Sequence, residues 1–179
     1  MHSAYLTVGP QGAGKSTFCE ELVRVYPGLA LLSRDRVFEE VFGEGWHSPY
    51  SGAFYVGMKI VWERVAELAA IHDQLILDCW NGTPEERQRY SDKLRSLGAT
   101  RVEAWHFVTP RDVCLGWYRQ KITAEQWCGP SVIEFNVGVC GVNYDKFHTF
   151  PVSPNQGFDL VRTIDPTLQD PTMSLLSVA

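Results

Sequence analysis

Short apolar runs alternate with longer amphipathic stretches along the chain. The runs with the length and composition of buried strands are 4–8, 29–32, 74–79, 101–108 and 159–164. Between them, 53–71 has the period of a helix with one apolar face, formed by Met58, Val61, Trp62, Val65, Leu68 and Ala69. Strands that alternate with helices predict an α/β fold, with a parallel sheet covered by helices on both faces.

Two more helices are indicated by local signals. Helical character over 17–25 follows the first strand, and a second helix should begin at Thr83 and end at Gly98. Thr83 is the expected N-cap, followed by proline and by a glutamate at the third helical position. The segments 43–52 and 122–131 have the composition of loops, and both should lie near the carboxyl ends of strands, where ligands bind such sheets.

Composition predicts one globular domain over residues 1–179, with a tail at 166–179. Of the 179 residues, 45% are hydrophobic and 21% charged, which suits a chain with a proper core. The five cysteines form no C-x-x-C pair, so neither a disulfide framework nor a zinc site is indicated. We expect a cytoplasmic protein, since no signal peptide or membrane-length apolar run is present.

The most informative motif is a phosphate loop at 9–17, GPQGAGKST, which matches G-x-x-x-x-G-K-[ST] at every fixed position. It stands between a predicted strand and a predicted helix, as this motif requires. It predicts ATP and Mg²⁺ as cofactors: Lys15 would reach the β- and γ-phosphates, and the Ser16 hydroxyl would bind Mg²⁺. The expected nucleotide-binding residues are Gly9, Gly12, Ala13, Gly14, Lys15, Ser16 and Thr17.

Two aspartates bear on the reaction, because a phosphate loop alone does not separate a kinase from a nucleotide switch. Asp35 follows the second predicted strand and Asp78 ends the third, so both should reach the edge of the sheet that carries the phosphate loop. Asp35 is the candidate base that accepts the proton of an attacking hydroxyl. Alternatively, Asp35 is the N-cap of a helix that begins at Arg36. Asp78 would position Mg²⁺ through water, or it is an exposed acid at a strand end.

With these residues in view, the chain resembles the 5′-polynucleotide kinases of phage and eukaryotes and their bacterial relatives. The matching stretches are GPQGAGKST (9–17), SRDR (33–36), ILDCWNGTPEERQRY (76–90), TPRDVCLGWYRQK (109–121) and YDKFHTFPVSPNQGFDLVRTID (144–165). The resemblance implies that Asp35 is the general base, that Lys15 and Ser16 contact triphosphate and metal, and that Arg119 is a lid arginine on the phosphates. The lid would span about 110–131.

The chain departs from this family where the acceptor binds. An arginine of the phage enzyme three residues beyond the base is replaced by Phe38, so Arg34 or Arg36 would have to hold the acceptor phosphate. The expected substrate-binding residues are Arg34, Arg36 and Asp78. The Asp-x-Thr-Asn signature is replaced by 78–83, and the lid carries fewer arginines. The aromatics at these elements either stack on a base or pack under loops; they are Trp46, Tyr50, Phe54, Tyr55, Trp80, Trp117 and Tyr118.

The sequence therefore predicts a P-loop kinase that moves the γ-phosphate of ATP to a hydroxyl of a nucleic acid, at a 5′-OH end or a hydroxymethylated base. The net charge of −5 argues against a broad nucleic-acid surface but leaves a local basic groove open. Its candidates are Arg34, Arg36, Arg119 and Lys121. The alternatives are a kinase of a nucleoside, sugar or antibiotic, and a non-catalytic nucleotide switch.

Overall fold

A five-stranded parallel sheet forms the centre of the computed structural model, which describes residues 1–43, 52–124 and 129–168. Its strand order is β2-β3-β1-β4-β5, and each neighbouring pair runs parallel. The strands are β1 (Ser3–Val8), β2 (Leu29–Ser33), β3 (Gln74–Asp78), β4 (Arg101–Phe107) and β5 (Leu160–Ile164). All five predicted strands are confirmed, and each bound agrees with the prediction to within one residue.

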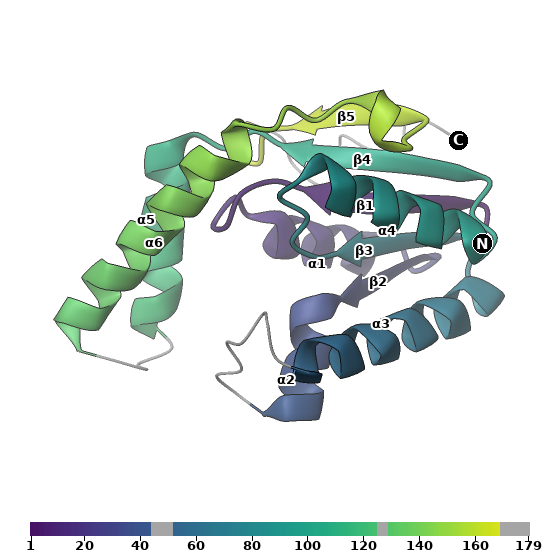
Figure 1. The fold of residues 1–179 in the computed structure, drawn as a ribbon, viewed down its shortest axis with the longest axis horizontal. Coiled ribbons are helices and arrows are strands. Elements are labelled where there is room, and N and C mark those ends of the chain that lie inside the picture. Colours follow the sequence, from purple (N-terminus) through teal and green to yellow (C-terminus); the bar gives the residue numbers. More distant parts are fainter. Residues whose placement is uncertain (44–51, 125–128, 169–179) are drawn as a thin grey trace.

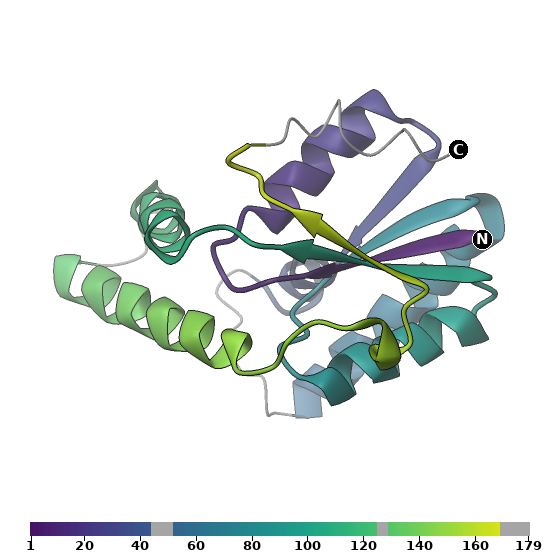
Figure 2. The same cartoon turned by 90° about the horizontal axis from the view of Figure 1, so that it is seen from above.

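Helices cover both faces of the sheet, as predicted. They are α1 (Lys15–Val25), α2 (Arg34–Phe42), α3 (Gly52–Ile71), α4 (Pro84–Ser96), α5 (Arg111–Ala124) and α6 (Pro130–His148), with a short 3-10 turn η1 (Pro154–Gln156). Figure 2, which views the sheet edge-on, shows α1 on one face and α3 and α4 on the other. This arrangement is the α/β architecture expected from alternating strands and helices.

Strand β3 shows how the sequence builds this core. Leu75 and Leu77 belong to the apolar cluster under α3 and α4, whereas Ile76 belongs to the cluster under α1. Because successive side chains of a strand point to opposite faces, a strand covered on both sides needs a continuous apolar run. The run ends at Asp78, the first acid, and the strand ends there too.

Helix α4 confirms the prediction made from its capping residues. The Thr83 hydroxyl accepts a hydrogen bond from the Glu86 amide at 3.2 Å, and the Glu86 carboxylate accepts one from the Thr83 amide at 3.1 Å. This reciprocal pair satisfies two amides that the first turn leaves unbonded. The chain turns after Leu97 through Gly98, whose φ is +100°.

Two sequence predictions are wrong. Asp35 does not cap α2, because Ser33 occupies the N-cap position and Asp35 lies inside the first turn. The segment 122–131 is not a loop throughout, since α5 continues to Ala124 and α6 begins at Pro130. Part of this segment, 125–128, lies outside the described residues, as do 44–51 with Trp46 and Tyr50, and the tail from 169 on.

Helices α5 and α6 form a hairpin beyond the edge at which the strands end (Figure 1). Arg111 at the start of α5 pairs with Asp145 of α6 at 2.9 Å, and the Tyr144 hydroxyl donates to the carbonyl of Thr109 at 3.2 Å. In the part of the chain that the structure describes, no helix has the length and apolar character needed to span a membrane.

Candidate functional site

The phosphate loop connects β1 to α1, as its motif predicts. Gly12 and Gly14 have φ values of +78° and +79°, in the left-handed region that only glycine adopts without strain. Gly14 is also the N-cap of α1, so the loop ends at the positive end of a helix dipole. Backbone amides at such a helix start are suited to an anion.

Lys15 places its ammonium group inside the loop. The Nζ atom donates hydrogen bonds to the carbonyls of Gly9 and Pro10, at 3.0 and 2.8 Å. Desolvation of this enclosed group lowers the pKa of Lys15, and the nearby carboxylates of Asp78 and Asp35 oppose the shift. Both aspartates therefore lie within electrostatic reach of the lysine, so the structure brings these three predicted site residues together.

Asp78 is buried at the floor of this site, with only 5% of its surface exposed. Its carboxylate accepts hydrogen bonds from the Ser16 hydroxyl at 2.6 Å and from the Thr7 hydroxyl at 2.8 Å. The alternative of an exposed strand-end acid is therefore wrong. A hydroxyl beside a carboxylate is an oxygen donor set that suits Mg²⁺, which takes one or two protein ligands and completes its shell with phosphates and water.

Asp35 lies at the same edge but faces solvent. In register, Ser33 at the end of β2 is paired with Asp78, which places Asp35 at the start of α2 next to the phosphate loop. Its side chain is 71% exposed, and one carboxylate oxygen accepts bonds from Arg34 Nε at 2.8 Å and Nη2 at 2.6 Å. The Arg34 side chain is only 15% exposed, and its guanidinium lies 5.8 Å from the centre of the Phe38 ring.

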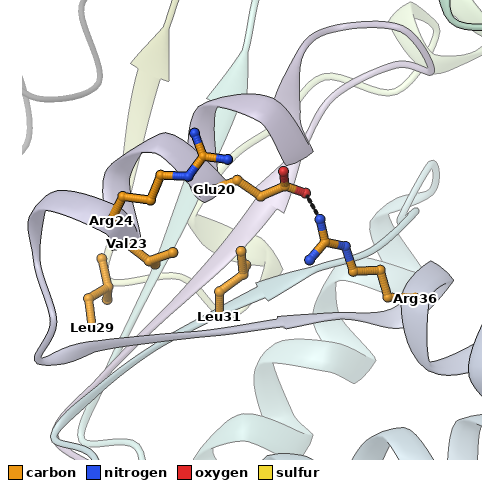
Figure 3. A pocket seen from close by; sticks show the side chains of 6 residues that line it. All are labelled: Glu20, Val23, Arg24, Leu29, Leu31 and Arg36. Carbon is orange, nitrogen blue, oxygen red and sulfur yellow. Dashed lines mark hydrogen bonds and ion pairs between the residues drawn. The ribbon is translucent and has the colours of Figure 1, made fainter.

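The two candidate acceptor arginines point in different directions. Arg34 stays beside Asp35, whereas Arg36 reaches across to Glu20 of α1 and pairs with it. Figure 3 shows this pair at one end of a shallow pocket above Leu29 and Leu31. Only Arg34 is therefore placed next to the candidate base.

Helix α5 packs directly on the phosphate loop. A Cβ atom on Gly12 would lie 2.5 Å from the Cys114 carbonyl oxygen and 3.2 Å from the Tyr118 Cβ, and one on Gly14 would lie 2.9 Å from the Trp117 ring. These three α5 residues, spaced by three and four, share one face of the helix. The Thr109 hydroxyl adds a hydrogen bond to the Ala13 carbonyl at 2.8 Å.

Arg119 is engaged by α6 in this structure. It pairs with Glu134 of α6, with one hydrogen bond from Nη2 of 2.9 Å, and both side chains are exposed. Two residues along a helix correspond to about 200°, so Arg119 lies on the other side of α5 from Trp117. Lys121 is exposed and lies one helical turn beyond Trp117, in line with it along the helix.

Several contacts of the site were not predicted from the sequence. Thr7 and Thr109 are short polar residues in or after apolar strands, and no motif distinguishes them. The Asn81 amide donates to the carbonyls of Thr7 and Cys79, at 2.7 and 3.1 Å, and joins the ends of β1 and β3. The ring centres of Trp80 and Phe147 lie 6.3 Å apart, so Trp80 packs against α6.

No group of three or more His, Cys, Asp or Glu side chains suited to a metal occurs among the described residues.

Comparison with known proteins assigns the fold and the family. The chain belongs to the AAA domain family, whose model matches residues 5–127. The chain has a P-loop kinase-like fold, an assignment shared with solved kinases. A comparison with curated protein sequences gives no match.

Three solved structures illustrate the likeness. A putative kinase from Chloroflexus aurantiacus is 18% identical, with a TM-score of 0.64 over 95% of this chain and 90% of that one. The Pnkp1/Rnl/Hen1 RNA repair complex contains a chain that is 23% identical, with a TM-score of 0.60 over 84% of this chain and 48% of that one. A sugar kinase from Janibacter sp. HTCC2649 is 18% identical, with a TM-score of 0.54 over 96% of this chain and 88% of that one.

Proposed function

We propose that this protein is an ATP-dependent phosphotransferase of the polynucleotide kinase type, which moves the γ-phosphate to a hydroxyl of a nucleic acid. The observation that carries the proposal is the placement of Asp35. An exposed carboxylate at the mouth of a phosphate loop, within electrostatic reach of Lys15, lies where a hydroxyl acceptor would have to approach. A nucleotide switch has no need of such a base.

The roles of the loop follow from its geometry. The amides at the start of α1 would hold phosphate oxygens, and the Lys15 ammonium would exchange the carbonyls of Gly9 and Pro10 for the β- and γ-phosphates. Ser16 and Asp78 would hold Mg²⁺, directly and through water. The bound ion would neutralise charge on the phosphates.

In the proposed transfer, the oxygen of the acceptor hydroxyl forms a bond to the γ-phosphorus, and Asp35 accepts the proton of that hydroxyl. The bond between the γ-phosphorus and the bridging β,γ-oxygen breaks, and ADP leaves with that electron pair. A cation from α5 would stabilise the transferred group. Arg119 would have to leave Glu134 to do so, whereas the exposed Lys121 lies one helical turn beyond Trp117, which contacts the loop.

The choice of acceptor rests on Arg34. Its guanidinium is next to the candidate base, where it can exchange Asp35 for an acceptor phosphate. The fold-level likeness to a chain of the RNA repair complex supports a nucleic acid. The rival is a small-molecule kinase, which the likeness to a sugar kinase and the net charge of −5 support.

One experiment separates these acceptors. The protein is incubated with γ-labelled ATP and, in parallel, with a 5′-OH oligonucleotide, a hydroxymethylated duplex, and a panel of nucleosides and sugars. We expect label on a nucleic acid, with an acceptor KM that rises with salt because phosphates must displace counterions. Arg34→Gln should flatten this rise, whereas Arg36→Gln, at the Glu20 pair, should leave it unchanged.

Two outcomes would contradict the nucleic-acid assignment. One is an oligonucleotide KM that does not respond to salt, and the other is a nucleoside or sugar that is phosphorylated as efficiently. Either result would assign the site to a small acceptor. Labelled inorganic phosphate as the sole product would remove the phosphotransferase proposal itself.

A further inference from the structure

Trp117 stands out among the aromatic residues near the phosphate loop. Its ring lies against Gly14, with two ring carbons 2.9 and 3.5 Å from the position of a Cβ on that glycine. It is partly exposed and belongs to neither of the two apolar clusters that the described residues form. Part of this tryptophan ring is therefore accessible beside the phosphate loop.

Trp117 lies at the end of α1 where the triphosphate of the proposed donor would bind. A triphosphate held by the amides at the start of α1 would leave its ribose and base near the same end of that helix. Two rings lie beside Gly14 there: Trp117 from α5 and, with its Cβ at 3.7 Å, Pro166 from the segment after β5. Pro166 is also partly exposed.

We propose that Trp117 is the platform on which the base of the donor nucleotide stacks, with Pro166 at its edge. This inference rests on the proposed function, because it requires a nucleoside triphosphate on the loop. Stacking between a base and an aromatic side chain is strong enough that its removal weakens binding about 5- to 150-fold. The proposed phosphate contacts come from Lys15 and the loop amides and not from the ring.

The test compares ATP with tripolyphosphate, which shares the phosphates and lacks the base. Magnesium-dependent binding of each is measured by calorimetry for the wild type and for Trp117→Phe and Trp117→Leu. Phenylalanine keeps a π-face, whereas leucine fills space on Gly14 without one. We expect Trp117→Leu to lose about 5- to 150-fold in ATP affinity, Trp117→Phe to lose far less, and tripolyphosphate to bind all three within about twofold.

Three outcomes would overturn the platform. Equal losses for ATP and tripolyphosphate would show that the ring only supports the loop, and equal ATP affinities for the leucine and phenylalanine variants would show that no π-face is used. A wild type that binds tripolyphosphate as tightly as ATP would show that the base has no site. A wild type that binds ATP on this platform but phosphorylates no acceptor would refute the proposed function and leave the platform standing. Thermal melts of each variant confirm that it is folded.

Discussion

Gly12→Ala tests whether α5 packs on the phosphate loop as described. The new methyl group would lie 2.5 Å from the Cys114 carbonyl oxygen and would have to move by about 0.9 Å to reach the 3.4 Å of ordinary contact. Overpacking of this kind costs about 1–3 kcal/mol. The φ of +78° adds about 1–2 kcal/mol for any residue with a side chain. Together these predict a loss of about 2–5 kcal/mol in the free energy of unfolding.

Gly116→Ala is the matched control on the same helix. A Cβ at Gly116 meets nothing within 4 Å, and alanine is favoured over glycine in a helix by about 0.5–1 kcal/mol. The two glycine-to-alanine changes should therefore shift stability in opposite directions. Equilibrium urea unfolding followed by circular dichroism measures both. A Gly12→Ala protein within about 0.5 kcal/mol of the wild type, the usual range of neutral surface changes, would refute the packing of α5 on the loop.

Three further predictions concern the caps, the pH response and the cation of α5. Thr83→Ala removes the α4 capping box and should cost about 1 kcal/mol in urea unfolding, whereas Thr83→Ser should cost far less. The pKa of His106 is lowered to about 4, mainly by burial and to a smaller extent by the nearby His148 and Arg87. The unfolded state therefore binds more protons between pH 6.5 and 4, and stability should fall by about 1–3 kcal/mol as the pH drops through this window. His106→Gln should reduce that slope, and an unchanged slope would contradict the assignment. Lys121→Ala should lower kcat more than Arg119→Ala does, because Arg119 is engaged by Glu134; the reverse order in steady-state kinetics would restore Arg119 as the cation.

Strands β1, β3 and β4 could be predicted from the sequence because each is buried along most of its length and reads as a mostly apolar run. The edge strands β2 and β5 are only partly buried. Helix α6 could not be predicted, since apolar residues occur on all its sides. Phe135 and Val142 are 70% and 65% exposed, while Val137 and Cys140 are buried. Such a helix lacks the contrast between faces on which periodicity depends.

Some residues of the candidate site could be predicted from the sequence and others could not. Residues of the phosphate loop are adjacent in sequence and form a motif, so their positions could be predicted. Thr7 and Trp117 reach the same place through packing, which no local pattern encodes. For Asp35, the sequence alone did not separate a helix N-cap from a general base. The structure removes the cap, because Ser33 holds that position, and the role as base stays a prediction.

Asp35→Asn tests the central claim most directly. Turnover of γ-labelled ATP with the preferred acceptor is measured for the wild type and the variant, with ATP binding determined in parallel. The asparagine keeps the shape of the side chain but cannot take the proton, so we predict a fall in turnover of roughly 10²–10⁴-fold with ATP affinity nearly unchanged. A variant that transfers phosphate at close to the wild-type rate would contradict the account, because Asp35 would then not be the base.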